Sequence, residues 1–198
     1  VLDEELLKIN LQILDLVQKE AGVEVICALK GYAMWSTFPL IRQHLSGATA
    51  SSLHEARLIY EEMGCEAHTY CPVFNEQEFD SLLHYSSHIT FNSLSQLERF
   101  RKRVSGFHKP VSVGLRINPE YSEVETELYN PAMPGSRLGI TIDHLGKQLP
   151  EGVEGLHFHV LCENDSHVLE RTLQRVEQKF GHLIRQARWF NMGGGHHI

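Results

Sequence analysis

The sequence predicts an α/β fold, a (β/α)8 TIM-type barrel that is incomplete, with about seven strands present. Short apolar runs alternate with amphipathic segments of helical period along the chain. Four strand starts follow one another at intervals of about 20 to 24 residues, the length of one strand–helix unit. The runs are apolar, as expected of parallel strands covered on both faces. No Gly-x-Gly-x-x-Gly turn follows the first run, which disfavours a dinucleotide-binding sheet.

The expected elements begin with an amphipathic helix over residues 3–21, closed by Gly22 as its C-terminal cap. Two later helix starts are marked by Asn75, before an acidic run, and by a capping box from Ser93 to Gln96. Strands are expected at residues 24–29, 48–51, 67–71, 88–92, 111–117, 155–161 and 188–192. Helices are expected between them at residues 38–45, 53–63, 76–85, 95–104 and 166–187.

One connection is much longer than the others. Residues 118–139 contain three prolines and no helical or strand periodicity. Irregular stretches of this length inside a domain are usually functional. Because the stretch follows the fifth strand, we expect it to overhang the face of the barrel where strand ends carry chemistry.

Charge, apolar run lengths and cysteine spacing disfavour several classes of function. The 198 residues carry a net charge of -7, which disfavours a nucleic-acid surface. No apolar run is long enough to span a bilayer, and the four cysteines lack the spacing of a disulfide framework. A reducing, cytoplasmic setting is the simplest expectation. The chain starts at Val1 rather than Met and stops after a glycine-rich turn at the seventh strand, so we expect a piece of a larger protein.

Lys30 is the first candidate for chemistry. It directly follows the first apolar run, and in a barrel the carboxyl ends of the strands carry the active site. An amine in such a place is a natural Schiff-base former, because desolvation lowers its pKa. The alternative is a lysine that simply extends from the strand end to solvent.

Other strand ends add complementary groups. Gly193, Gly194 and Gly195 follow the seventh strand, where backbone amides can approach a phosphate, although a flexible turn is the alternative. Arg116 ends the fifth strand and suits a phenolate or carboxylate oxygen, or else a structural ion pair. The amine of Lys30, a histidine imidazole, Arg116 and backbone amides for a phosphate together suit a pyridoxal phosphate site.

The histidines raise a competing interpretation, a metal site. His157 and His159 flank Phe158, and we expect them on opposite faces of the strand, a poor arrangement for chelating one ion. Cys162 and His167 lie nearby, but no Cys-x-x-Cys pair supports a structural zinc. The sequence therefore predicts no metal site.

Several motifs, in order, resemble a known family. The motifs are Ala-Leu-Lys-Gly-Tyr at 28–32, Ser-Arg-Leu-Gly at 136–139, Gly-Leu-His-Phe-His-Val at 155–160 and Met-Gly-Gly-Gly at 192–195. They are similar to the fold-type III pyridoxal phosphate decarboxylases, such as those of ornithine and diaminopimelate. Met-Trp-Ser-Thr-Phe at 34–38, Asn-Pro-Ala at 130–132 and Cys-Glu-Asn at 162–164 resemble the carboxynorspermidine (carboxyspermidine) decarboxylases within that group.

The resemblance implies roles for individual residues. Lys30 would hold pyridoxal 5'-phosphate as a Schiff base, and His159 would stack on its ring. Arg116 would contact the phenolic oxygen of the ring or a nearby carboxylate. The three glycines, Gly193, Gly194 and Gly195, would bind the phosphate. Glu163 and Asn164 would bind the cofactor or the amines of a small polyamine substrate.

The resemblance also implies what lies outside the chain. Residues 1–198 would be the cofactor-binding barrel domain, incomplete at both ends. The family's second, β-rich domain would supply the carboxylate that pairs with the pyridine nitrogen, and a partner subunit would complete the site across a homodimer. No nucleic-acid or membrane partner is expected. The implied reaction is decarboxylation of carboxynorspermidine or carboxyspermidine to norspermidine or spermidine. A non-catalytic pyridoxal phosphate carrier and a metal-dependent barrel hydrolase are the alternatives.

Overall fold

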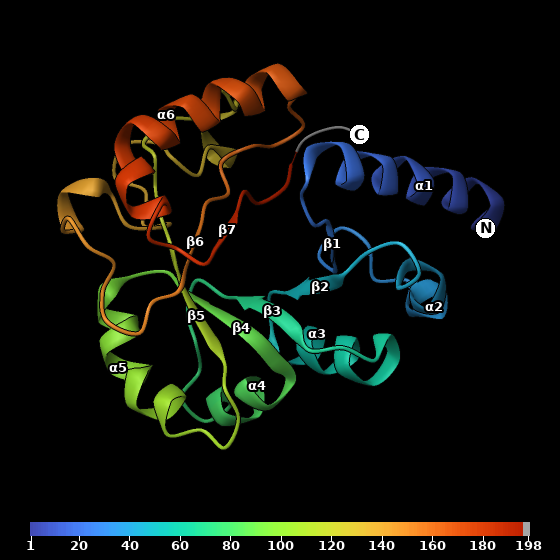
Figure 1. The fold of residues 1–198 in the computed structure, drawn as a ribbon, viewed down its shortest axis with the longest axis horizontal. Coiled ribbons are helices and arrows are strands. Elements are labelled where there is room, and N and C mark those ends of the chain that lie inside the picture. The colour runs from blue at the N-terminus through green and yellow to red at the C-terminus, as the bar shows by residue number, and fades with distance from the viewer. Residues whose placement is uncertain (196–198) are drawn as a thin grey trace. The chain divides into compact units, whose positions relative to one another are not determined.

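The structure is a computed structural model and describes residues 1–195. It divides into two compact units, Val1–Ile89 and Thr90–Ile198. The seven strands follow one another in chain order in the sheet, from β1 to β7, and helices alternate with them along the chain (Figure 1). The predicted α/β fold, an incomplete (β/α)8 barrel, is confirmed. No helix in residues 1–195 is both long and apolar enough to cross a membrane.

The first unit contains three short parallel strands. Ile26 of β1 pairs with Gly47 of β2, and Thr49 of β2 pairs with His68 of β3. The elements are α1 (Glu4–Ala21), β1 (Ile26–Ala28), η1 (Trp35–Thr37), α2 (Phe38–Ile41), β2 (Gly47–Ala50), α3 (Leu53–Leu58), η2 (Ile59–Met63), β3 (Ala67–Tyr70) and α4 (Phe79–Tyr85). Strand β4 (Ser86–Phe91) crosses the boundary between the units.

Local signals place two of the three predicted helix ends. Gly22 closes α1 in the left-handed conformation, with φ of 64°, as predicted. Ser93 caps α5 (Leu94–Ser105) by accepting from the Gln96 amide, and the Gln96 side chain accepts from the Asn92 amide. The predicted start after Asn75 is wrong, since α4 begins only at Phe79. The Asn75 side chain instead closes a local turn by accepting from the Gln77 amide.

The second unit also has three parallel strands. The remaining elements are β5 (Ser112–Arg116), η3 (Glu127–Tyr129), η4 (Ile142–His144), β6 (Gly155–His157), α6 (Ser166–Ile184) and β7 (Trp189–Asn191). Strand β6 pairs with β5 on one side and with β7 on the other. Residues 118–139 are irregular apart from the single turn η3, as the sequence predicts.

A tryptophan fixes the spacing of these three strands. The Trp189 indole lies directly on Gly114 of β5 and Gly155 of β6, where a Cβ atom would come within 2.2 Å and 2.0 Å of the ring. Its Nε1 donates to the Ser112 hydroxyl at 2.8 Å. Only residues without a side chain leave room for the ring, so the glycines set how β5, β6 and β7 pack.

Candidate functional site

In the first unit, Lys30 lies at the carboxyl end of β1, as predicted. The turn that carries it is closed by the Gly31 and Tyr32 amides, which both donate to the Ala28 carbonyl at 2.9 and 3.0 Å. The Lys30 side chain is exposed. Burial within this unit therefore does not supply the desolvation that the strand-end position led us to expect.

A cavity of about 350 Å³ lies at the carboxyl ends of β2 and β3. Ser51, Ser52 and Cys71 line it, and the Cys71 thiol contacts the Ser51 carbonyl oxygen at 3.0 Å. Burial, together with the carboxylates of Glu55 and Glu78, raises the pKa of Cys71 to about 12. The thiol is thus protonated at neutral pH and is not a nucleophile. Glu55 accepts from the Ser51 amide at 2.6 Å and so has a structural contact.

In the second unit, three polar side chains form one row across the sheet. Arg116 pairs with His157, and His157 pairs with Asn191, at the carboxyl ends of β5, β6 and β7. In parallel sheets of α/β proteins this edge carries ligand sites. Two of the three, His157 and Asn191, were not among the site residues expected from the sequence.

Asn191 connects the histidine to the glycine segment. Its side-chain oxygen accepts from the Gly193 amide at 2.8 Å and lies 3.1 Å from Nδ1 of His157. The Asn191 carbonyl oxygen lies 3.2 Å from the same ring nitrogen. Because both neighbours are acceptors, Nδ1 of His157 carries the proton. Asn191 was missed because the sequence places it within the predicted strand 188–192, and only its cross-strand neighbours reveal its contacts.

The charge state of His157 follows from its surroundings. Burial, with a smaller contribution from the nearby Arg116 and His159, lowers its pKa to about 3. The ring is therefore neutral in the folded protein throughout the physiological range.

The expectation that His157 and His159 face opposite sides is wrong. Residues two apart in extended backbone point to the same face, and Phe158 between them is fully buried on the other. His157 contacts Asn191, and Nδ1 of His159 accepts from the Gly194 amide at 3.3 Å. Both imidazoles therefore serve the glycine segment. Among residues 1–195, no three His, Cys, Asp or Glu side chains are grouped as metal ligands.

The three glycines have different surroundings. A Cβ on Gly193 would lie 2.4 Å from the Phe158 carbonyl oxygen, and one on Gly195 would lie 2.1 Å from that of Leu161. Both glycines have positive φ, 71° and 97°. At Gly194, by contrast, no atom of the described residues beyond its chain neighbours lies within 4 Å of a Cβ. The protein itself requires glycine at 193 and 195, whereas position 194 borders open space.

Strand β6 was predicted to run to residue 161 but ends at His157. The backbone beyond it lies so close to the glycine segment that side chains at 193 and 195 would clash with it, while the Phe158 amide still bonds to β7, at the Asn191 carbonyl. Arg116, only 3% exposed, donates from Nη2 to the His159 carbonyl oxygen at 2.9 Å. Arg116 therefore holds the backbone that carries His159.

The Cys-Glu-Asn motif forms a tight turn. Glu163 has a φ of 54°, and the Asn164 side-chain oxygen accepts from the Cys162 amide at 2.9 Å. The Asn164 amide donates to the Gly195 carbonyl at 3.1 Å, which ties the turn to the glycine segment. Glu163 is exposed. The side-chain oxygen of Asn164 is thus used within the protein, whereas Glu163 faces solvent.

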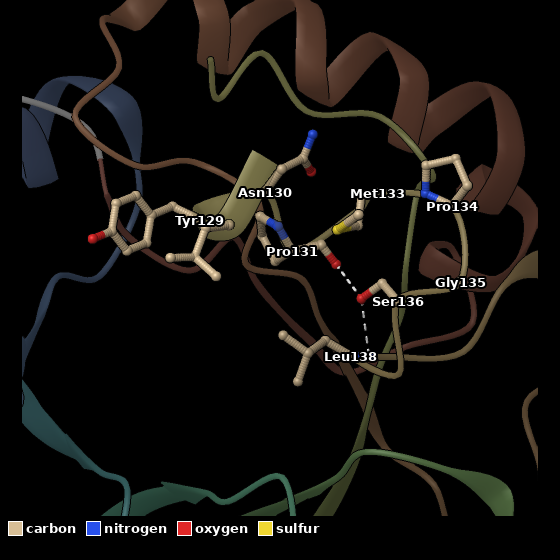
Figure 2. A pocket seen from close by; sticks show the side chains of 9 residues that line it. Tyr129, Asn130, Pro131, Met133, Pro134, Gly135, Ser136 and Leu138 are labelled. Atoms are coloured by element: carbon tan, nitrogen blue, oxygen red, sulfur yellow. Dashed lines mark hydrogen bonds between the residues drawn. The ribbon is translucent and has the colours of Figure 1, made fainter. Parts of the chain in front are cut away.

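The long connection after β5 is organised around its own polar groups. The Asn92 side chain at the end of β4 accepts from the Gly139 amide at 2.9 Å and donates to the Arg137 carbonyl at 2.8 Å. Ser136 donates to the Pro131 carbonyl at 2.6 Å inside a cavity of about 240 Å³ (Figure 2). The Ser-Arg-Leu-Gly motif is therefore anchored to a strand end.

Two histidines that are neutral when folded predict acid sensitivity. In the first unit, burial and the His88 ring, stacked at a centroid distance of 3.9 Å, lower the pKa of His68 to about 4. For His68 and His157 the unfolded state binds more protons below about pH 6.5. Stability is therefore full above that pH and is lost as the pH falls towards 4 and 3. Urea unfolding between pH 5 and 6.5 should show a slope of up to about 1.4 kcal/mol per pH unit per histidine.

In the His157→Asn variant, the slope of the unfolding free energy against pH should be smaller by the contribution of one histidine. The matched control is His54→Asn, because the His54 side chain is exposed on α3. A wild-type unfolding free energy that is flat over this window would contradict the assignment.

Sequence comparison finds curated proteins that match essentially the whole chain. The chain is 48% identical over 196 residues to the carboxyaminopropylagmatine decarboxylase of Synechocystis sp., covering 99% of this chain and 50% of that protein. It is 41% identical over 198 residues to the carboxynorspermidine/carboxyspermidine decarboxylase of Campylobacter jejuni, covering 100% and 51%. The chain thus spans about half the length of the curated relatives it matches. No family profile matches it.

Solved structures agree. The crystal structure of carboxynorspermidine decarboxylase from Campylobacter jejuni, complexed with norspermidine, matches with a TM-score of 0.88 and 39% identity, covering 98% of this chain and 49% of that chain. Diaminopimelate decarboxylase from Helicobacter pylori, complexed with L-lysine, matches with a TM-score of 0.74 at 17% identity, covering 94% and 53%. The second likeness shows the fold alone.

Proposed function

We propose that this chain, which is homologous over its whole length to half of the carboxynorspermidine decarboxylases and their relatives, holds pyridoxal 5'-phosphate for an amino-acid decarboxylation in polyamine synthesis. The substrate would be carboxynorspermidine or carboxyspermidine, and the product norspermidine or spermidine. A homodimer and a cytoplasmic setting belong to the same proposal. The resemblance supports the first, and the cysteine spacing supports the second.

The open space at Gly194 carries the cofactor part of the proposal. Its neighbours Gly193 and Gly195 are explained by close backbone packing, but Gly194 has no such neighbour among the described residues. A bound phosphate explains why this position also lacks a side chain. The Gly193 amide donates to Asn191, whereas the Gly194 amide makes only a long bond of 3.3 Å to His159. The Gly194 amide is therefore the readier donor to an anion.

The residues of this chain fit the cofactor in complementary ways. Lys30, an exposed residue at the carboxyl end of β1, would hold it covalently through Nζ. His159, whose backbone is held by the Arg116 bond to its carbonyl, would present its imidazole to the ring. When bound, pyridoxal phosphate supplies the electron sink for loss of a carboxylate as carbon dioxide.

A second substrate is favoured by one observation. The relative with 48% identity is named a carboxyaminopropylagmatine decarboxylase, whereas the relatives named for carboxynorspermidine/carboxyspermidine are 41% and 36% identical. Carboxyaminopropylagmatine carries a guanidinium where the other substrates carry an ammonium group. It therefore belongs in the same assay.

Carbon dioxide release tests the proposal. The complete protein with pyridoxal phosphate should decarboxylate one of these three compounds, and Lys30→Ala should reduce the rate by several orders of magnitude. Binding of pyridoxal phosphate without carbon dioxide from any of them would favour the non-catalytic carrier. Release that is insensitive to Lys30→Ala would contradict the role of this lysine.

A further inference from the structure

The first residues of the long connection lie along α6 and are tied to it by basic side chains. Residues 120–123, here called the strap, follow β5 and reach helix α6 (Figure 1). We propose that the strap positions the backbone that carries His159, through Ser122, and that Arg171 of α6 holds the strap in place. The proposal rests on the proposed function in one respect, that His159 serves the cofactor.

Three basic residues on one face of α6 contact the strap in reverse order. Arg171, Arg175 and Lys179 are spaced four residues apart, which places them on one side of the helix. Going along α6, each of these residues contacts a residue earlier in the strap than the one before. Arg171 contacts Glu123, Arg175 lies over the Tyr121 ring at 5.5 Å, and Lys179 contacts Glu120 at 2.8 Å. The strap therefore runs antiparallel to α6.

The pair of Glu123 and Arg171 is the strongest of these contacts. Nε and Nη2 of Arg171 donate to the two carboxylate oxygens of Glu123 at 2.8 and 2.7 Å, and the Tyr121 hydroxyl donates to the same carboxylate. Two parallel charged hydrogen bonds fix geometry as well as charge. The Arg171 guanidinium and the Tyr121 hydroxyl lower the pKa of Glu123 to about 2, so the pair persists across the neutral range. Glu123 is thus engaged with α6 and is not a solvated acid facing a substrate.

Ser122 transmits this anchoring to the site. Its hydroxyl donates to the Val160 carbonyl oxygen at 2.6 Å, next to the His159 carbonyl that accepts from Arg116. Residues 158–161 belong to no strand, so the sheet ladder does not hold these two carbonyls. Arg116 of β5 and Ser122 of the strap bind these two carbonyl groups instead. Loss of the strap contact should therefore loosen the backbone at His159.

Hydrogen exchange in the cofactor-free protein tests the positioning directly. In Ser122→Ala we expect the hydrogen-bonded amides of Phe158 and Cys162, which flank this backbone, to exchange about fivefold faster, the loss of one net hydrogen bond. In Arg171→Met both these amides and those of residues 120–124 should exchange faster, and Arg171→Lys, which keeps the charge, should restore part of the protection. The control is Arg101→Met, since Arg101 also pairs with carboxylates of the same unit, Glu98 at 3.3 Å and Glu151 at 3.7 Å, but does not contact the strap.

A second measurement separates positioning from general stability. The Kd for pyridoxal phosphate should rise severalfold in Ser122→Ala and stay unchanged in Arg101→Met. Faster exchange at 120–124 with unchanged exchange at Phe158 and Cys162 would overturn the proposal, as would unchanged exchange at both places. Failure of the proposed function would look different, because wild-type protein would then release no carbon dioxide while the exchange results stood.

Discussion

Replacing Lys30 with alanine is expected to abolish the visible absorbance band that pyridoxal phosphate gives when it is linked to a lysine of this protein. Lys30 carries a primary amine at the carboxyl end of β1, the group that forms a Schiff base with an aldehyde, and the residue is exposed. Its removal would leave the proposed phosphate and ring contacts but no covalent bond. The measurement is a titration of the complete protein with pyridoxal phosphate, followed by absorbance.

Lys147→Ala is the matched control for this titration. Lys147 is also exposed in an irregular segment, but it follows no strand of the sheet. Its variant should give the wild-type band. A band of unaltered intensity in Lys30→Ala would show that another lysine takes the aldehyde.

The second large effect is expected from alanine substitutions in the glycine segment. Substitutions at 193 and 195 should lower the stability of the fold, whereas one at 194 should leave it nearly unchanged. Gly193→Ala and Gly195→Ala should each lower the free energy of unfolding by about 3 kcal/mol or more. Positive φ costs an alanine about 1–2 kcal/mol, and the carbonyl contacts below 2.5 Å add to that. Gly194→Ala should change stability by less than about 1 kcal/mol, because its Cβ would enter open space.

The same variants separate structure from ligand binding. If the open space beside Gly194 receives the phosphate, Gly194→Ala should weaken pyridoxal phosphate by about tenfold or more while the protein stays folded. Urea unfolding and a Kd measured on each variant give both quantities. Unchanged affinity in a stable Gly194→Ala variant would refute the placement of the phosphate.

Much of the fold could be predicted because its signals are local. Alternating apolar runs located all seven strands, and the Gly22 cap and the Ser93 capping box were identified by residue type alone. The signal at Asn75 failed because an asparagine side chain closes a turn as readily as it caps a helix. Strand β6 was predicted too long because packing against Gly193 and Gly195, which are distant in sequence, ends the ladder.

The strand-end positions of the candidate residues were predictable from the sequence, but their contacts were not. Strand-end logic selected Lys30, Arg116 and the glycines as candidates, and the structure places them at or just after strand ends. Arg116 in the structure holds the carbonyl of His159, a contact between residues 43 positions apart that no sequence pattern shows. Asn191 was missed for the same reason, since its importance depends on the cross-strand neighbours. Parallel register brings such groups together, and register is a property of the folded sheet.

Lys30 belongs to one compact unit, and the histidine and glycines belong to the other. The central claim is that both serve the same cofactor. A crystal structure of the complete protein, reduced with borohydride in the presence of pyridoxal phosphate, tests it most directly. We expect continuous density from Lys30 Nζ to the pyridine ring, with the ring against His159 and the phosphate beside Gly194. A phosphate held elsewhere, with the space at Gly194 filled by protein or solvent, would contradict the account.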